Sequence, residues 1–280
     1  MKIVIAGAGR RPIPPTGYGG MERYIDEYAS ALRKGGHSVR IVNTLASGAL
    51  TDPWTFARHL PGLLRGAEER IVHVNTSHAG IVLGLAGIPF VYTTHNPYWF
   101  VSRNAGQEVL WEKEALAVRF ARGSVAFTDR LRERMGALRV RRGPVVTIPL
   151  GVDPERFAPH GEGSADLALG VGEISPRKNW AVAARALRGT GVRLRIVGPI
   201  RDPDLADELR RLGAELTGEV ADDALRSEYA RAGFLVHPSL HEALPGVVLQ
   251  AMACGRPVIG SPAIASIDGV LAAPQGDDAV

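Results

Sequence analysis

One segment near the C-terminus places an acidic residue directly before a predicted helix. A short apolar run, 233–236, ends at Pro238, and a helical pattern begins near Gly246. Free backbone N–H groups at Gly246 and Val247 would point at a ligand, and such a helix end favours an anion by about 0.3 to 1 kcal/mol when exposed. The pattern predicts a phosphate site with Glu242 beside it; the alternative is a solvated loop acid and an ordinary turn glycine.

A parallel sheet is needed to position this segment. Apolar runs of four to six residues alternate with helical patterns, which is typical of a parallel sheet covered by helices on both faces. The predicted strands are 2–6, 39–43, 71–74, 90–94, 124–128, 145–148, 167–171, 193–197, 214–216, 233–237, 257–260 and 270–272. The predicted helices of the second half are 179–188, 203–212, 221–231 and 246–254.

A turn-rich passage from Gly151 to Asp166, which contains Pro154 and Pro159, is the best candidate for a linker. We therefore predict an α/β protein with two doubly wound, Rossmann-like domains, 1–150 and 151–280, that face a central cleft. Ligands of such domains bind beyond the carboxyl ends of the strands, so we expect the functional site between the domains.

The composition permits two globular domains. With 280 residues, of which 45% are hydrophobic and 22% charged, each domain is large enough to bury a core. Cys254 is the only cysteine, which excludes an intramolecular disulfide and favours a packing role. Residues 1–7 are too short an apolar stretch for a signal peptide, and no run approaches the roughly 20 apolar residues of a membrane-spanning helix. We expect a cytoplasmic protein.

The formal net charge of +4 comes largely from arginine, much of it in the stretch 119–142. Such a stretch is usually a solvated face, but it would also allow peripheral contact with the acidic inner face of a membrane. Both interpretations stay open. Nucleic acid is not an expected partner, because no binding motif is present and the charge is modest for that role.

The segment around Glu242 resembles the E-x7-E motif of retaining glycosyltransferases with the GT-B fold, in particular glycosyltransferase family 4. Glu242 falls on the first Glu of the motif and Gln250 on the second. In that family the first Glu lies at the donor sugar, and the second binds the ribose of the nucleotide. Gln250 departs from the pattern: an amide still donates and accepts hydrogen bonds, but it lacks the charge that strengthens them.

Further segments resemble the same family in order and spacing, so that the resemblance covers nearly the whole chain. They are Ala6–Gly7 with 19–24, 148–157, 172–179, 217–220 and 229–239. The resemblance implies an N-terminal acceptor domain, 1–150, and a C-terminal nucleotide-sugar donor domain, 151–280. It also makes the C-terminus look short, since family members usually continue through further helices.

The loop 172–179 resembles the family segment whose Arg and Lys hold the donor diphosphate. Lys178 keeps the family position, and Arg177 lies beside it, but Glu173 stands where Arg is common. Two unit charges about 4 Å apart interact by roughly 4 kcal/mol at an effective dielectric of 20, so a Glu facing a diphosphate would weaken binding. Three arrangements are open: Glu173 pairs with Arg177, Arg177 takes the missing Arg's role, or the donor site is degraded.

His95 follows a predicted strand and should emerge at its carboxyl edge. By resemblance to the family's T-x-H segment, His95 would line the pocket at the transferred sugar, with its ring near a sugar hydroxyl. A neutral imidazole can both donate and accept a hydrogen bond near pH 7. Gly19 and Gly20 resemble the family glycines that let the acceptor substrate approach the start of the first helix; the alternative is an ordinary connecting loop.

The resemblance implies a retaining hexosyltransferase that moves a sugar from a nucleotide diphosphate sugar to a hydroxyl group of a sugar, glycan or lipid-linked acceptor. His95 and Glu242 would be its catalytic residues, and Arg177, Lys178, Gly246, Val247 and Gln250 would bind the nucleotide sugar. No metal and no cofactor beyond this co-substrate is expected. Two alternatives stay open: a catalytically silent sugar- or nucleotide-binding protein of this fold, and a non-transferring GT-B enzyme such as a sugar-nucleotide epimerase or a phosphorylase.

Overall fold

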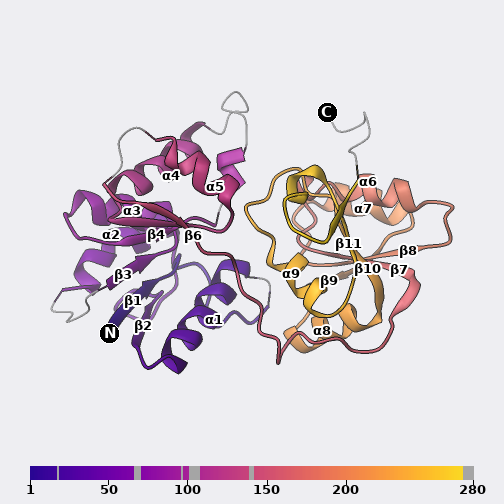
Figure 1. Ribbon diagram of the computed structural model, residues 1–280, viewed down its shortest axis with the longest axis horizontal. Helices are drawn as coiled ribbons and strands as arrows, with labels where there is room; N and C mark the ends of the chain where they lie inside the picture. Colours follow the sequence, from indigo (N-terminus) through magenta and orange to yellow (C-terminus); the bar gives the residue numbers. More distant parts are fainter. Residues whose placement is uncertain (18, 66–70, 96, 101–107, 139–141, 274–280) are drawn as a thin grey trace. The chain divides into compact units, whose positions relative to one another are not determined.

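The computed structural model describes residues 1–273 except 18, 66–70, 96, 101–107 and 139–141. The chain forms two compact units, Met1–Leu150 and Gly151–Val280. Figure 1 shows the first unit in indigo to magenta and the second in red to yellow. Each unit is described by itself.

The first unit is built on a six-stranded parallel sheet with the strand order β2-β1-β3-β4-β5-β6. Its strands are β1 (Lys2–Ala6), β2 (Ser38–Val42), β3 (Ile71–Val74), β4 (Val91–Thr93), β5 (Gly123–Ala126) and β6 (Val145–Thr147). Its helices are α1 (Gly20–Lys34), α2 (Pro53–Leu63), α3 (Ser77–Leu85), α4 (Glu108–Phe120) and α5 (Asp129–Gly136), with a 3-10 turn η1 (Pro97–Phe100).

The second unit has its own six-stranded parallel sheet, with the order β12-β11-β10-β7-β8-β9. Its strands are β7 (Ser164–Val171), β8 (Arg193–Val197), β9 (Glu215–Gly218), β10 (Ala232–His237), β11 (Val258–Gly260) and β12 (Val270–Ala272). Its helices are α6 (Trp180–Leu187), α7 (Pro203–Arg211), α8 (Asp222–Arg231) and α9 (Gly246–Ala253), with 3-10 turns η2 (Pro176–Lys178) and η3 (Pro262–Ile264).

The predicted α/β architecture and strand positions are confirmed, with small shifts at the ends of elements. The largest shift is at β7, which begins at Ser164, inside the passage predicted as linker, because Ser164 pairs with Ala232 of β10. Helix α6 begins only at Trp180, since Asn179 adopts a left-handed conformation with φ 52° that separates it from η2.

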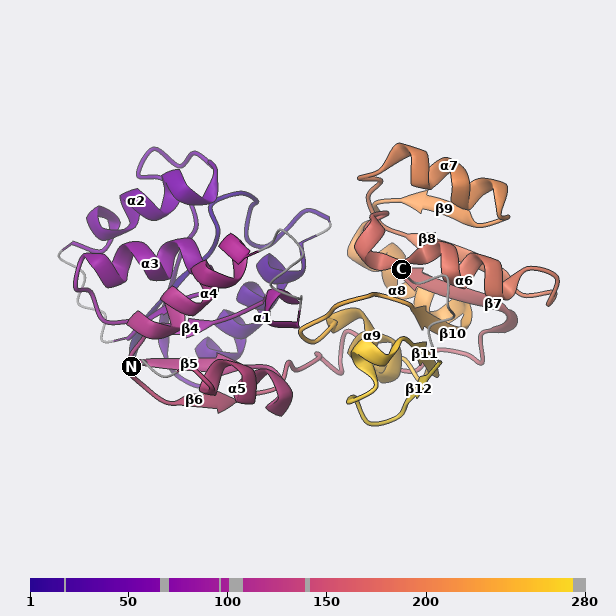
Figure 2. The ribbon, with the colours of Figure 1, turned by 90° about the horizontal axis from the view of Figure 1, so that it is seen from above.

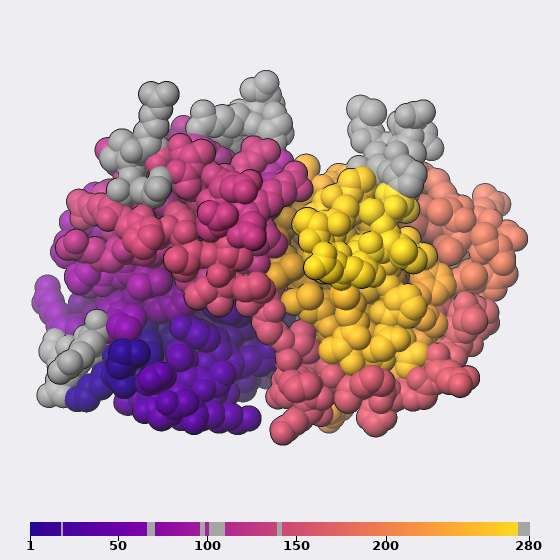
Figure 3. Space-filling model, viewed as in Figure 1, coloured from indigo at the N-terminus to yellow at the C-terminus, as the bar shows by residue number. Residues whose placement is uncertain are grey.

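Helices cover both faces of the second sheet. On one face Leu235 packs with Tyr229 of α8 and Val248 of α9. On the other face Ile196 packs with Trp180 of α6, and α7 covers the same cluster. This is the doubly wound arrangement expected when every strand of a parallel sheet is apolar on both sides. The edge strand β12, yellow in Figure 3, lies at the surface of this unit.

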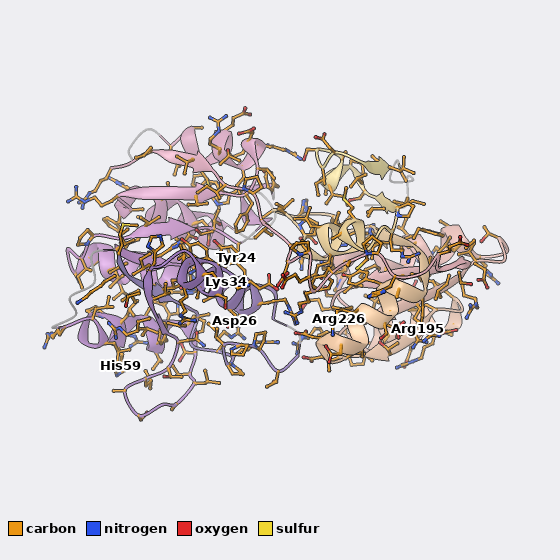
Figure 4. All side chains as sticks on the ribbon, turned by 60° about the horizontal axis from the view of Figure 1, so that its bottom comes forward. Tyr24, Asp26, Lys34, His59, Arg195 and Arg226 are labelled. Atoms are coloured by element: carbon orange, nitrogen blue, oxygen red, sulfur yellow. The ribbon has the colours of Figure 1, made fainter. Side chains whose placement is uncertain are left out.

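In the first unit, one hydrophobic cluster joins the first strand to the first helix. Ile3 and Ile5 of β1 pack against Ile25 and Ala29 of α1. Helices α2, α3 and α4 pack against one another in sequence order (Figure 2). Tyr24, labelled in Figure 4, lies on α1 next to this core.

Each sheet has a point at which the strand order reverses. In the first unit it lies between β1 and β3, and in the second between β7 and β10. Connections on the two sides of such a point leave in opposite directions, which opens a crevice at the carboxyl ends of the strands. Residues that directly follow these four strands are therefore at the position where folds of this kind bind their ligands.

Two glycines shape the loop that leaves β7. Gly172 has φ 153° and Gly198 has φ 154°, a region that residues with a side chain rarely adopt. A Cβ atom on Gly198 would lie 2.0 Å from the carbonyl oxygen of Gly172. Only glycine therefore lets the ends of β7 and β8 approach closely enough to hold the following loop, 173–178, at the edge of the sheet.

Candidate active site

Three hydrogen-bond donors converge on one carboxylate oxygen in the second unit. Glu242 Oε1 accepts from Lys178 Nζ at 2.7 Å and from Arg177 Nη1 at 3.1 Å, and His237 Nε2 lies 3.1 Å away. Both cations come from η2, which follows β7, whereas His237 ends β10 and Glu242 follows it. The strand reversal thus brings the two predicted segments together.

This cluster is nearly closed to solvent. Only 7% of the Lys178 side chain and 11% of the Glu242 side chain is exposed, and His237 is fully buried. Burial lowers the pKa of Lys178, although Glu242 opposes that shift. Burial alone would raise the pKa of Glu242, but Lys178, the hydrogen bond from His237 and the charge of Arg177 outweigh it and hold the pKa well below its usual range. Each partner therefore offsets part of the cost of burying the other.

The carboxylate of Glu173 has polar and charged partners within the second unit. Its Oε1 lies 3.4 Å from Arg177 Nη2 and 3.3 Å from Ser175 Oγ, and its Oε2 lies 4.0 Å from Arg201 Nε. Its backbone carbonyl accepts a hydrogen bond from Trp180 Nε1 at 2.9 Å. Of the three arrangements open for this residue, the structure has the one in which Glu173 pairs with Arg177.

Helix α9 begins at Gly246, as the sequence predicts, and no side chain caps its N-terminus. A Cβ atom on Gly246 would meet nothing within 4 Å, so this helix end has open space beside it. Gln250, one helical turn further on, is buried, and its Oε1 accepts from the Tyr229 hydroxyl at 3.1 Å. The same hydroxyl lies 3.1 Å from the Val247 carbonyl oxygen.

The first unit holds His95 in an aromatic cage at the carboxyl edge of its sheet. The ring makes edge contacts with Tyr24 of α1, with centroids 4.8 Å apart, and with Phe127 after β5, at 5.1 Å. His95 Nε2 lies 2.9 Å from Oδ1 of Asn75, which directly follows β3. His95 follows the end of β4, as predicted. This position lets it contact residues of α1 and residues that follow β5 and β3.

A second histidine lies close to this cage. His73 Nε2 lies 2.6 Å from the Thr93 hydroxyl, and both side chains are buried. Burial lowers the pKa of His73 to about 4. Burial, together with the charge of His73, lowers the pKa of His95 to about 3. Both imidazoles are therefore neutral at pH 7.

Gly19 and Gly20 lie at the start of α1. Gly19 is the N-cap residue, and a Cβ atom on it would lie 3.0 Å from Glu22 Oε2. A Cβ atom on Gly20 would meet nothing within 4 Å. The space beside Gly20 is compatible with the approach of a substrate, and equally with an ordinary helix start.

Sequence reasoning did not identify Asn75, Tyr24 and Phe127 as neighbours of His95. Asn75 carried a usable signal, since it is a polar residue directly after a strand beside the point of strand reversal. His237, at the end of β10, is a further buried partner of the Glu242 carboxylate.

Within the described residues, no group of three His, Cys, Asp or Glu side chains is arranged to hold a metal ion. Likewise, no helix in the described part of the chain is long and apolar enough to cross a membrane. In the arginine-rich stretch, Arg130 and Arg134 of α5 are exposed while Leu131 and Met135 face inward. Residues 139–141 of that stretch lie outside the described residues.

Curated relatives resemble this chain over most of its length. A D-inositol 3-phosphate glycosyltransferase of Actinosynnema mirum is 29% identical, and the match covers 89% of this chain and 77% of the relative. An alpha-maltose-1-phosphate synthase of Mycobacterium tuberculosis is 26% identical, covering 90% of this chain and 78% of the relative.

Solved structures share the fold. Sucrose-phosphate synthase from Thermosynechococcus elongatus superposes with a TM-score of 0.81 at 19% identity, covering 99% of this chain and 86% of that one. AviGT4, a glycosyltransferase involved in avilamycin A biosynthesis, gives a TM-score of 0.70 at 24% identity, covering 95% and 81%. The HepE protein of Anabaena in complex with UDP-glucose gives 0.69 at 20% identity, covering 94% and 81%.

Two family models match the two halves of the chain. The model for Glycosyltransferase Family 4 matches residues 18–156, and the model for Glycosyl transferases group 1 matches residues 167–280. The two matches follow the order of the two units and together span most of the sequence. The protein is therefore a glycosyltransferase of the GT-B fold that belongs to family 4, group 1.

Proposed function

We propose that this chain transfers a hexose from a nucleotide diphosphate sugar to a hydroxyl group of a sugar, glycan or lipid-linked acceptor, with retention of anomeric configuration. The second unit binds the donor and the first unit binds the acceptor. The observation that carries the proposal is the buried cluster of Lys178, Arg177 and Glu242 at the point where the second sheet reverses. The complex of HepE with UDP-glucose supports a nucleotide sugar as the donor class.

Lys178 and Arg177 are the proposed ligands of the donor diphosphate. Both share one carboxylate oxygen of Glu242, so the cationic ends are already held together before a ligand arrives. Donors fixed in advance in a site of low water content stabilise developing negative charge more strongly than mobile ones. The open N-terminus of α9 at Gly246 adds backbone N–H groups, with Val247, for the same anion.

The proposed transfer breaks one bond and forms one bond at the anomeric carbon. The bond between the anomeric carbon and the diphosphate oxygen breaks, and the acceptor oxygen forms a bond to that carbon on the same face. The acceptor proton passes to an oxygen of the departing diphosphate, whose negative charge Lys178 and Arg177 stabilise. In this proposal no protein side chain serves as general base, and protein cations take the place of a metal.

Glu242 and His95 are proposed to contact the transferred sugar. Glu242 Oε1 is occupied by its three donors, which leaves Oε2 as the carboxylate oxygen available for a sugar hydroxyl. His95 is neutral at pH 7 and can exchange hydrogen bonds with a hydroxyl group. Gln250 is proposed to bind the nucleotide ribose through its amide N–H groups, because its oxygen already accepts from Tyr229.

Calorimetric titration with UDP, GDP, ADP and TDP tests the donor site. We expect one nucleotide to bind, and Lys178→Ala to weaken that binding by about 1.5 to 3 kcal/mol, the range of a hydrogen bond to a charged group. Arg185→Ala is the matched control, because Arg185 is an exposed cation of the same unit that pairs with Glu208. Equal loss in both variants, or no binding to any nucleotide, would argue against the proposed site.

A catalytically silent binding protein is the second candidate, favoured by Gln250 in place of the second Glu of the motif. It predicts nucleotide binding without turnover. A sugar-nucleotide epimerase predicts conversion of the donor with no acceptor present. Product analysis with and without acceptor, in the presence of EDTA, separates both from transfer and tests whether a metal is required.

A further inference from the structure

We propose that Asn75 is a positioning residue that holds His95 as the Nε2–H tautomer and so presents the Nδ1 lone pair to a substrate hydroxyl group. The inference rests on the proposed role of His95 at the transferred sugar. It goes beyond that role, because it assigns which ring nitrogen meets the substrate and which residue selects it.

The orientation of the Asn75 side chain is fixed by a hydrogen bond from its amide nitrogen, the end of the side chain that does not face His95. Asn75 is 1% exposed, and its Nδ2 donates to the backbone carbonyl of Ala6 at 3.2 Å. Ala6 ends β1 and pairs with Val74, so the register of the sheet places this carbonyl next to the amide. Since Nδ2 must donate, Oδ1 is the atom that faces His95.

An acceptor at Asn75 Oδ1 dictates the protonation of the His95 ring. Oδ1 has no hydrogen to donate, so the contact of 2.9 Å to His95 Nε2 is a hydrogen bond only if Nε2 carries the proton. Burial keeps the ring neutral at pH 7, which leaves Nδ1 with its lone pair. Among the described residues, Nδ1 has no hydrogen-bond partner.

The ring is also restrained from turning. Tyr24 and Phe127 contact it at 4.8 Å and 5.1 Å between centroids. A flip that exchanged the two nitrogens would break the bond to Asn75 and leave a buried amide oxygen without its partner, which is costly. The His95 ring is thus held in one orientation. Its Nδ1 can accept a hydrogen bond from a substrate hydroxyl group and so orient that group.

Nitrogen NMR of histidine-labelled protein tests the tautomer without any substrate. The protonated and unprotonated ring nitrogens resonate far apart, and His95→Gln identifies the signals by their loss. We expect the wild type to show Nε2–H, and Asn75→Ala to lose this preference. Asn43→Ala is the matched control, because Asn43 is a buried amide after β2 that binds Gly9 N at 3.0 Å and should leave the His95 signals unchanged.

Asn75→Asp gives a second, isosteric variant. A carboxylate beside Nε2 favours the imidazolium, so the pKa of His95 should rise from about 3 to between about 4 and 6. The groups that titrate around the ring, His73 on β3 and Tyr24 on α1, remain the same. In this variant we expect kcat to rise with pH as His95 loses its extra proton, whereas the wild type is flat over that range. Asn75→Ala should lower kcat by about tenfold, the effect of one ordinary hydrogen bond.

The outcomes separate the two proposals. A wild-type spectrum with Nδ1–H, or an unchanged tautomer in Asn75→Ala, overturns the role of Asn75. The expected spectra without turnover of any sugar nucleotide would support the tautomer assignment and overturn the proposed function instead. Turnover that is unaffected in Asn75→Ala, with a thermal melt like that of the wild type, would also overturn the positioning role.

Discussion

Lys178 Nζ lies 2.7 Å from Glu242 Oε1, and this ion pair between η2 and the loop after β10 is nearly buried. Two ions removed from water are stable only as a pair, because each supplies the other's missing solvation. A ligand phosphate at this lysine would share its charge with the carboxylate. The pair therefore links the stability of the second unit to its capacity to bind an anion.

Replacing the Glu242 carboxylate by a neutral group tests this link between stability and anion binding. Glu242→Gln leaves a buried ammonium without its counter-ion, and we expect the free energy of unfolding to fall by about 3 kcal/mol. Saturating nucleotide should recover part of the loss, since a diphosphate would supply the missing negative charge. Urea unfolding with and without nucleotide measures both effects.

Glu208→Gln is the control for that experiment. Glu208 pairs with Arg185 at 2.8 Å, but both side chains are well exposed. An exposed pair contributes about 1 kcal/mol or less. A similar loss in the two variants would mean that the Lys178–Glu242 pair is not a buried one in solution.

Two histidines of the first unit, His73 and His95, predict how its stability depends on pH. The pKa of His73 is about 4 and that of His95 about 3, both below the ordinary value, so the unfolded chain binds more protons as the pH falls below about 6.5. The stabilisation is therefore complete above pH 6.5 and is lost progressively toward pH 4.

Urea unfolding at pH 7 and pH 5 measures this loss. Each histidine should contribute roughly 2 kcal/mol to the difference, at about 1.4 kcal/mol per pH unit. His73→Gln should reduce the difference in unfolding free energy between pH 7 and pH 5 by the roughly 2 kcal/mol of one histidine, whatever its effect on stability at pH 7. An exposed histidine, His59, provides the comparison: His59→Gln should leave the difference as in the wild type. Identical pH profiles for the wild type and His73→Gln would contradict a neutral buried His73.

The sequence predicted the sheet better than it predicted the site. Strands 71–74 and 270–272 coincide with β3 and β12, because short apolar runs bounded by turns are local signals. The contact between His95 and Asn75 joins residues on different strand ends, and it depends on the register of β3 against β4. Such a register is set by packing that no single segment encodes.

The loop 172–179 shows the same limit. The sequence identified Lys178, Arg177 and the unexpected Glu173, but the direction in which Glu173 points depends on non-local contacts. Its carbonyl is held by Trp180, and its carboxylate by Arg177. Sequence spacing supplied the candidates, while the fold decided which charges are paired.

Gln250 offers a test of the nucleotide site that does not depend on turnover. Gln250→Glu restores the charge of the family motif: the amide N–H groups proposed to donate to the ribose are replaced by a carboxylate oxygen that accepts from a ribose hydroxyl, and the Tyr229 hydroxyl is in place to donate to the other oxygen. A charged acceptor makes a hydrogen bond roughly twice as strong as a neutral one, so we expect binding of the preferred nucleotide to tighten by about 1 kcal/mol. Calorimetry with the ribonucleotide and its deoxyribose analogues measures the gain, which should vanish when the contacted hydroxyl is absent. A gain that persists with every analogue would place Gln250 away from the ribose.

Gly20 tests the proposed acceptor side in the first unit. A Cβ atom there meets no other part of the described chain within 4 Å, so Gly20→Val should fold with nearly the stability of the wild type. If the acceptor approaches this space, the added methyl groups should raise the KM for the acceptor by about tenfold, since misplacing a substrate by the width of a methyl group costs of order 1 kcal/mol or more. The nucleotide affinity should not change, because the donor is assigned to the second unit. Initial rates at varied acceptor concentration, with calorimetry of the nucleotide, distinguish these effects, and an unchanged acceptor KM would show that Gly20 begins a helix and nothing more.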